Sequence, residues 1–166
     1  MKVTNRKQVF KPYKKLNNKH VIIMFDYKPI TKMVNGEEIE TPLASWEEYR
    51  FNHIPTLEEI KSIVISYYNK QVDEKILSGF KWKDMQIWLS NENQFNYKAA
   101  YDLAVQTNGK TLPIYFKFGD ENNAIYYEFK TLEDITDFYI KSLSFIQTTL
   151  QNGWKKKDSI DWSIFQ

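Results

Sequence analysis

The chain has 166 residues and the composition of an ordinary globular protein, enough for one domain or for one domain with an appendage. Hydrophobic residues make up 42% and aromatic residues 16% of it, which excludes global disorder because aromatic side chains bury large apolar areas. The absence of cysteine excludes disulfides, cysteine-bound zinc and a thiol nucleophile. The longest apolar run, Val21 to Phe25, is too short for a membrane span or a signal-peptide core, so we expect a soluble protein without a membrane partner that is kept in a cytoplasm or assembled into a particle there.

Positive charge is concentrated at the start of the chain, although the net charge is only +2. The rest of the chain holds 16 of the 23 basic residues and all 21 acidic residues, a net charge of −5. This asymmetry predicts a basic arm over residues 1–19 that docks onto an acidic partner, either nucleic acid or a neighbouring copy. A solvated tail is the alternative. The seven basic residues of the arm are Lys2, Arg6, Lys7, Lys11, Lys14, Lys15 and Lys19.

The residues after the arm predict β structure. The run HVIIMFDY has the length of a strand and is bounded by Pro29. Asn35-Gly36 predicts a hairpin, because both central residues of a type I′ turn need a positive φ. Pro42 is predicted to end the second strand, and the following SWEEYRFNHI fits either a strand or a short helix. We assign residues 20–54 to a small β-rich docking subdomain, which either stands alone or adds strands to the sheet that follows.

The pattern then changes to helical. Thr56 and Glu59 have the spacing of a capping box, in which each residue satisfies a backbone N–H of the other. The helix that begins there extends through VDEKIL, where Gly79 stops it. The next segment, GFKWKDMQIWLS, alternates apolar and polar residues around Lys83-Asp84 and predicts a hairpin.

A second hairpin lies between two further helices. Ser90 is the predicted N-cap of a helix from about residue 91 to residue 107. Alternating segments then flank a turn at Gly119–Asn123. Thr131 caps a last amphipathic helix, which Asn152-Gly153 is predicted to close.

These elements predict an α+β fold over residues 55–166. Their order is helix, hairpin, helix, hairpin, helix, with an antiparallel sheet covered by helices on one face. The small β-rich region precedes this domain.

No catalytic or metal-binding constellation is recognisable in the sequence. His20 and His53 lack a partner at the spacing of a helical metal site, and glycine-rich phosphate loops and nucleophile motifs are absent. The acidic turn at Asp120 and Glu121 lacks the register of a calcium-binding loop and is interpreted as a solvated turn. We therefore predict that the protein is not an enzyme and has no catalytic residue, metal site or cofactor.

Both ends of the chain carry candidate partner-binding residues. The basic arm combines cations with aromatic rings, as nucleic-acid contact by phosphate pairing and base stacking requires. The last thirteen residues contain aromatic side chains among charges, which either anchor an interface or close the chain's own core. The candidates are Arg6, Lys7, Lys11, Tyr13, Lys14, Lys15, Trp154, Trp162 and Phe165.

The stretch from about residue 73 to residue 161 resembles a domain family of unknown function found in tail-fibre and tail-related proteins of tailed bacteriophages. The resemblance is carried by DEKILSGFKWKDMQIWLSNENQFNYKAAYDLA, LPIYFKFGDENN, YEFKTLEDITDFY and WKKKDSID, in this order and spacing. It covers a little over half of the chain, implies no catalytic motif, and implies a virion component or assembly protein.

We therefore expect a structural or assembly component of a bacteriophage particle, most naturally of the tail, baseplate or fibre attachment. Its expected partners are other phage structural proteins and further copies of itself in a symmetric assembly, and its expected location is the virion, assembled in the host cytoplasm. The alternative is a small phage-encoded nucleic-acid-binding or host-takeover protein that uses the basic arm.

Overall fold

The structure, a computed structural model, describes residues 1–119 and 122–166. The chain divides into two compact units. We call Met1–Ser66 together with Ile160–Gln166 the sheet unit, and Tyr67–Ser159 the helical unit. Helices and antiparallel strands occur together, so the predicted α+β class is confirmed.

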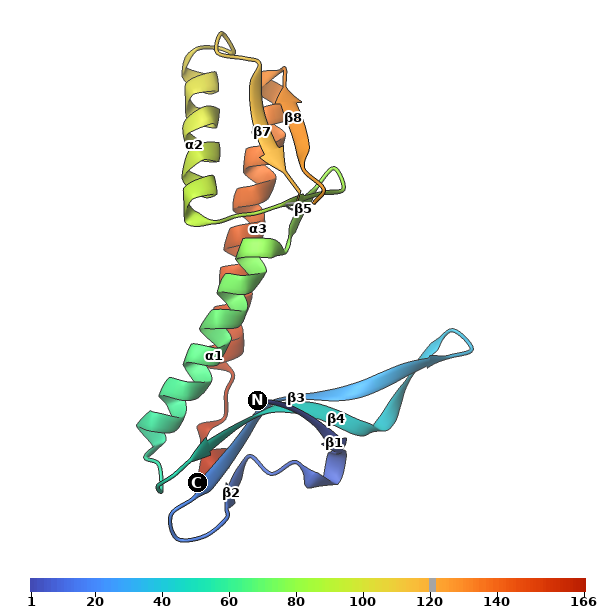
Figure 1. Ribbon diagram of the computed structural model, residues 1–166, viewed down its shortest axis with the longest axis vertical. Coiled ribbons are helices and arrows are strands. Elements are labelled where there is room, and N and C mark those ends of the chain that lie inside the picture. Colours follow the sequence, from blue (N-terminus) through green and yellow to red (C-terminus); the bar gives the residue numbers. More distant parts are fainter. Residues whose placement is uncertain (120–121) are drawn as a thin grey trace. The chain divides into compact units, whose positions relative to one another are not determined.

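The sheet unit is built around a four-stranded antiparallel sheet with the strand order β1-β4-β3-β2 (Figure 1). β1 pairs only with β4, and β2 pairs only with β3, so both are edge strands. The residues predicted as a basic arm thus supply the two edges of this sheet, and the predicted hairpin region supplies its centre. The elements are β1 (Lys2–Arg6), the 3-10 helix η1 (Lys7–Val9), β2 (Tyr13–Lys15), β3 (Val21–Val34) and β4 (Glu37–Phe51).

The centre of the sheet is buried on both faces. Ile22 belongs to a buried cluster on one face, whereas its neighbours Val21 and Ile23 are fully buried on the other. Phe10 packs on the first cluster, with its ring 5.6 Å from that of Trp46. Burial on both faces explains why this strand is a continuous apolar run and not an alternating one.

Both prolines that were predicted to bound strands lie inside strands. β3 continues through Pro29 and β4 through Pro42, so the two predicted strand ends are wrong. The register shifts here, because Pro29 pairs with Ala44 but Thr31 pairs with Glu40, which leaves Pro42 in an irregular part of the ladder. Proline is tolerated at such an irregularity, since no ladder hydrogen bond requires its missing N–H.

The SWEEYRFNHI segment, for which strand and helix were both open, is strand as far as Phe51. A short 3-10 helix, η2 (Trp162–Phe165), lies in the C-terminal piece of the sheet unit.

The helical unit has the predicted order of helix, hairpin, helix, hairpin and helix. Its two hairpins are separate two-stranded sheets, linked where the Gly119 N–H donates to the Gln86 carbonyl at 2.9 Å. The elements are α1 (Leu57–Ser78, whose first part belongs to the sheet unit), β5 (Phe80–Trp82), β6 (Met85–Ile87), α2 (Asn91–Gln106), β7 (Ile114–Phe118), β8 (Ile125–Phe129) and α3 (Leu132–Asp158).

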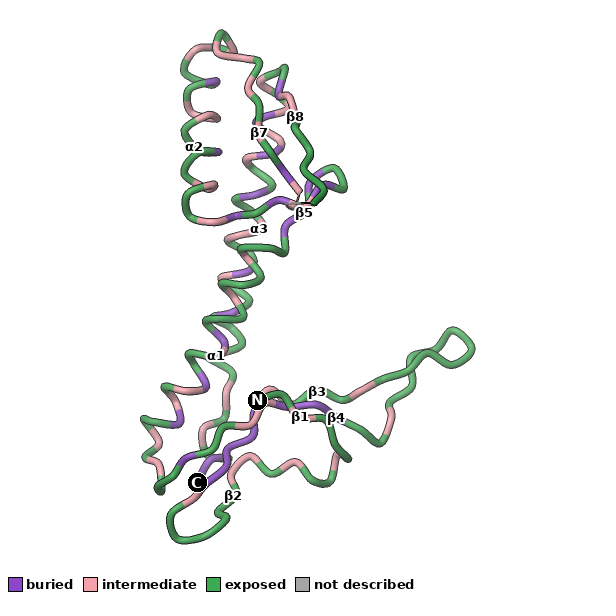
Figure 2. The backbone as a smooth tube through the Cα atoms, viewed as in Figure 1, coloured by how far each residue is buried: buried purple, intermediate pink, exposed green. Residues whose placement is uncertain are grey.

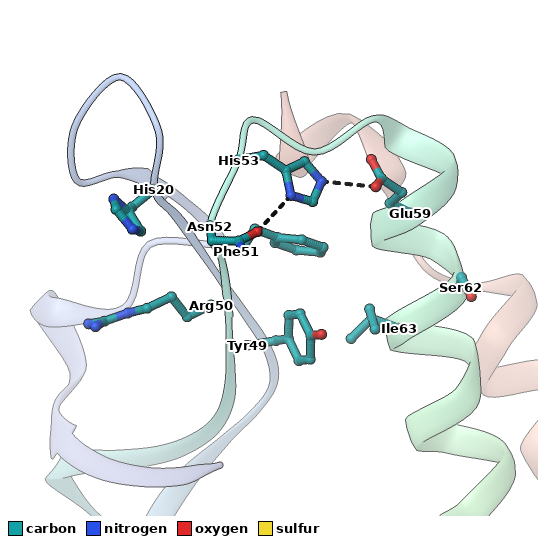
Figure 3. Close-up of a pocket in the computed structure, with 9 residues that line it drawn as sticks. All are labelled: His20, Tyr49, Arg50, Phe51, Asn52, His53, Glu59, Ser62 and Ile63. Atoms are coloured by element: carbon teal, nitrogen blue, oxygen red, sulfur yellow. Dashed lines mark hydrogen bonds and ion pairs between the residues drawn. The ribbon is translucent and has the colours of Figure 1, made fainter.

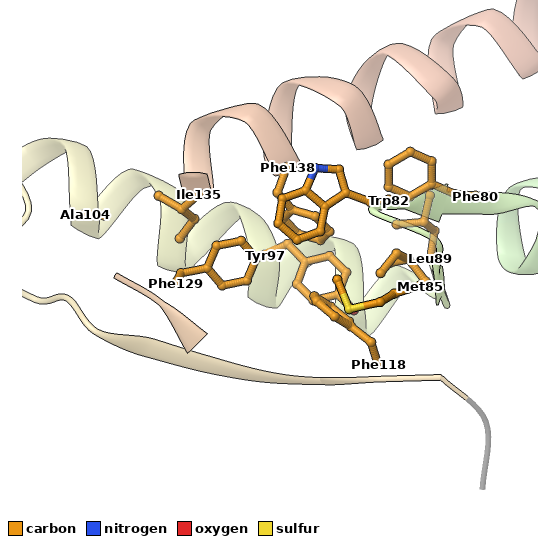
Figure 4. Close-up of a cluster of buried hydrophobic side chains, with 11 residues drawn as sticks. Phe80, Trp82, Met85, Leu89, Tyr97, Ala104, Phe118, Phe129, Ile135 and Phe138 are labelled. Atoms are coloured by element: carbon orange, nitrogen blue, oxygen red, sulfur yellow. The ribbon is translucent and has the colours of Figure 1, made fainter. Parts of the chain in front are cut away.

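Aromatic side chains form the core of the helical unit (Figure 4). The Trp82 ring stacks on Phe129 at 5.4 Å between centroids and meets Phe138 edge-on at 5.2 Å. Tyr97 of α2 meets Phe138 of α3 at 5.0 Å. The hairpins are therefore attached to α2 and α3 through one aromatic cluster, which explains why the chain is so rich in Phe, Tyr and Trp.

The predicted helix starts are confirmed. The Ser90 hydroxyl accepts from the Asn93 N–H at 3.2 Å, and the Thr131 hydroxyl accepts from the Asp134 N–H at 3.2 Å. At α1 the Thr56 N–H donates to Glu59 at 2.7 Å, which completes the capping box.

The predicted end of the last helix is wrong. α3 continues through Gly153 to Asp158, where Ser159 is the C-cap. Gly153 is buried, and a Cβ built on it would lie 2.4 Å from Cγ2 of Val72 in α1. Glycine is needed here because α1 and α3 approach closely, and not because the helix ends.

Candidate functional site

The basic residues predicted to bind a partner are divided between the two edges of the sheet. Arg6 ends β1, and Lys14 and Lys15 lie in β2, with the two central strands between them. Lys14 pairs with Ile22 and Lys15 with Val21, so these two lysines point to opposite faces. The structure therefore brings together Lys11, Tyr13, Lys14 and Lys15 along one edge and places Arg6 and Lys7 at the other.

One cation of this set has an acidic partner within the chain. Lys7 Nζ donates to the Glu40 carboxylate of β4 at 2.5 Å. Within the described part of the chain, Arg6, Lys11, Lys14 and Lys15 form no ion pair. Lysines on an edge strand oppose the addition of a further strand, so these side chains favour contact with an acidic surface over backbone pairing.

The feature that sequence reasoning missed is the outer part of the β3–β4 hairpin. We call residues 31–40 the projecting hairpin, because β1 and β2 pair only with inner parts of β4 and β3 (Figure 1). Every one of its residues is exposed, as the green segment of Figure 2 shows, and Met33 is 67% exposed. Two-stranded ribbons are marginally stable in water, so this segment is a candidate for contact with another molecule.

The turn of the projecting hairpin was predictable, but its length was not. Asn35 and Gly36 have φ values of 53° and 86°, as a type I′ turn requires. Its apolar side chains, Met33, Val34 and Ile39, suggest a buried sheet when read from the sequence, but they are exposed. The presence of three glutamates beside these few apolar residues is the signal that could have indicated an uncovered ribbon.

The three aromatic candidates at the end of the chain have different environments. Phe165 is 3% exposed and belongs to the core. Of the two alternatives, an interface anchor or a residue that closes the chain's own core, the second is therefore observed for Phe165. Trp162 is half-buried, with its ring 6.1 Å from Phe165. Trp154 is 54% exposed on α3 and remains available to a partner.

Both histidines line a pocket of about 620 Å³ in the sheet unit (Figure 3). His53 lies between Glu59, 2.9 Å from its Nε2, and Asn52, 3.1 Å from its Nδ1. The pKa of Glu59 is lowered, chiefly by the Thr56 backbone N–H and hydroxyl and then by His53. Glu59 closes the capping box with Thr56, so its contact with His53 lies at the start of α1.

A second polar cluster stabilises the helical unit. Lys83 Nζ donates to Asp134 at 2.6 Å and to the Tyr127 hydroxyl at 2.7 Å, and that hydroxyl donates to Asp134 at 2.7 Å. The pKa of Lys83 is raised, mainly by its hydrogen bond to Asp134. The cluster joins three elements, because Lys83 lies in the β5–β6 turn, Tyr127 in β8 and Asp134 in α3.

The described residues contain no group of three or more potential ligands that could hold a metal ion. The acidic turn at Asp120 and Glu121 lies outside the described residues. Across residues 1–119 and 122–166, no helix has the length and apolar character of a membrane span.

Comparison with known proteins gives no relative: no family model, curated protein or solved structure matches the chain.

Proposed function

We propose that this chain is a structural or assembly component of a bacteriophage particle, in the tail, baseplate or fibre attachment, and that it acts through protein–protein contacts in the virion. The observation that carries the proposal is the resemblance of residues 73–161 to the tail-associated family. In this structure those residues include the strand-to-helix junction at Ser90 and the aromatic core around Trp82, which are architectural features.

The surfaces of the chain support the same proposal. The projecting hairpin exposes apolar side chains, the sheet edges expose lysines, and α3 exposes Trp154. Exposed apolar groups surrounded by charge are typical of protein interfaces, in which the apolar groups are covered and the charges form the rim.

Deletion of the gene from the phage tests this proposal. A structural component leaves phage DNA replication unchanged, while electron microscopy of the lysate shows particles that lack a tail part. Expression of the chain from a plasmid should restore complete particles. Normal particles with reduced DNA replication would contradict the structural role and favour the host-takeover alternative.

The nucleic-acid alternative rests on the seven basic residues and the absence of acids in residues 1–20. Removing residues 1–19 is unsuitable as a test, because β1 and β2 would be removed with them. The double substitution K14E/K15E leaves the sheet intact, and K110E/K117E in the helical unit is the matched control. If the edge lysines bind DNA, K14E/K15E alone weakens binding and the affinity of the unaltered protein falls steeply with added salt. If the chain is a particle protein, we expect negligible DNA affinity for the unaltered chain, for K14E/K15E and for K110E/K117E.

A further inference from the structure

The chain carries opposite charges on two surfaces of the sheet unit that it cannot bring together itself. The projecting hairpin contains three glutamates and one lysine, and the edge formed by β2 and its flanking residues contains four lysines and no acid. The acidic residues are Glu37, Glu38 and Glu40, and the basic residues are Lys11, Lys14, Lys15 and Lys19.

Strand geometry keeps these two surfaces apart within one molecule. β2 pairs with β3 at Ile23, and the end of β3 at Val34 lies eleven residues further along the strand. At the usual rise per residue this is roughly 35 Å, more than a lysine and a glutamate side chain together can span. Contact between the tip of the projecting hairpin and the β2 edge therefore requires two molecules.

The ion pair between Lys7 and Glu40 is an example of a lysine that binds a glutamate of the projecting hairpin. Lys7 Nζ of η1 lies 2.5 Å from a carboxylate oxygen of Glu40, at the base of this hairpin. Glu37 and Glu38 lie next to the turn and reach no lysine of their own chain within the described residues. A second copy supplies lysines of the same kind.

Apolar side chains accompany the charges on both surfaces. Met33 lies directly opposite Glu38 in the register, so both point from the same face of the ribbon, and Met33 is 67% exposed. On the other surface Leu16 follows Lys15 and is 41% exposed. The two surfaces thus match in charge and both offer apolar area to bury.

We propose that the projecting hairpin of one copy docks onto the β2 edge of a second copy, with Glu37 and Glu38 against Lys14 and Lys15. The contact is head-to-tail, because each copy contributes its projecting hairpin to one neighbour and its β2 edge to another. Such contacts repeat from copy to copy and build a ring or a filament. The inference deepens the proposed function and rests on it, since it names the contact through which copies assemble.

Charge reversal on each surface tests the contact in the full chain. The hairpin variant is E37K/E38K, the edge variant is K14E/K15E, and the swapped variant carries all four substitutions. Matched controls make the same charge changes at exposed positions of the helical unit, D73K/D158K and K110E/K117E. Circular dichroism first verifies that every variant is folded, and sedimentation then measures the mass as a function of concentration.

We expect the unaltered protein and both controls to associate beyond a monomer, more weakly at high salt. The hairpin and edge variants should each lose at least about tenfold in association constant, because the contact would join like charges. The swapped variant should associate again. An equimolar mixture of the hairpin and edge variants should also associate beyond a dimer, since the unaltered hairpin of one matches the unaltered edge of the other and the two reversed surfaces match as they do in the swapped variant.

Three results would overturn the inference: a monomer for the unaltered protein at its highest soluble concentration, a swapped variant that is folded but does not associate, or controls as impaired as the variants. If the chain is monomeric but is still found in virions, the inference fails and the proposed function stands. If it assembles through the hairpin but deletion of its gene leaves particles complete, the proposed function fails.

Discussion

Substitution of Gly153 by alanine perturbs a point where α3 lies close to α1. The added Cβ would lie 2.4 Å from Cγ2 of Val72, far inside van der Waals contact. Valine is β-branched and stiff at χ1 in a helix, so the methyl group cannot rotate away without cost. The helices must separate, or Val72 must leave its preferred rotamer.

Two opposing effects decide the magnitude. Alanine in place of glycine inside a helix gains about 1 kcal/mol of helix propensity. Overpacking of a well-packed contact costs about 1–3 kcal/mol. The difference predicts that Gly153→Ala lowers the free energy of unfolding by roughly 1 kcal/mol.

A double-mutant cycle with Val72→Ala separates these effects. Without the two Val72 methyl groups, the nearest Val72 atom to the new Cβ is its own Cβ at 3.7 Å, an ordinary contact. Gly153→Ala should therefore stabilise the Val72→Ala protein by about 1 kcal/mol, the helix propensity alone. Chemical denaturation followed by circular dichroism measures all four proteins. A stabilising Gly153→Ala change in the unaltered protein, with no coupling to Val72, would refute the close approach.

Three further substitutions test local features of the fold. Ser90→Ala removes the N-cap of α2 and should lower the free energy of unfolding by about 1 kcal/mol, and an unchanged midpoint would contradict the cap. Burial raises the pKa of Tyr97 to about 12, above the value of about 10 in an unfolded chain. Its contribution to stability is thus complete below pH 10 and lost as the pH rises towards 12, so Tyr97→Phe should reduce the loss of stability in a pH titration over this range. The lowered pKa of Glu59 contributes stability that is present above the ordinary glutamate range and lost as the pH falls through its folded value, so Glu59→Gln should flatten the acid limb of the same titration.

Local chemistry made much of the fold predictable. A hydroxyl before a helical pattern specifies a start, and Ser90, Thr131 and Thr56 all lie where this rule places them. The turn at Asn35-Gly36 was predicted from residue types that adopt a positive φ, and the turn at Lys83-Asp84 from the alternation of apolar and polar residues around it; all four residues have a positive φ.

The wrong predictions share one physical cause, which is tertiary context. Pro42 lies inside a strand because a register shift in the neighbouring strand removes the need for its N–H. Gly153 lies inside a helix because another helix packs against it, and its contact Val72 is 81 residues away in the sequence. A pattern read along the chain contains no information about a partner so distant.

The candidate interaction surfaces were only half predictable for the same reason. Counting charges identified Lys11, Lys14 and Lys15, but it could not divide the basic residues between two sheet edges. The apolar residues of the projecting hairpin are exposed because β1 and β2 pair only with the inner parts of β4 and β3. The sequences of β1 and β2 do not indicate where along β3 and β4 this pairing ends.

Mass spectrometry of gradient-purified phage particles tests the central proposal most directly. Peptides of this chain should sediment with intact particles, in a constant ratio to the tail proteins across the particle fractions and after a high-salt wash. A chain that is abundant in the infected-cell lysate but missing from purified particles would contradict its assignment as a particle component.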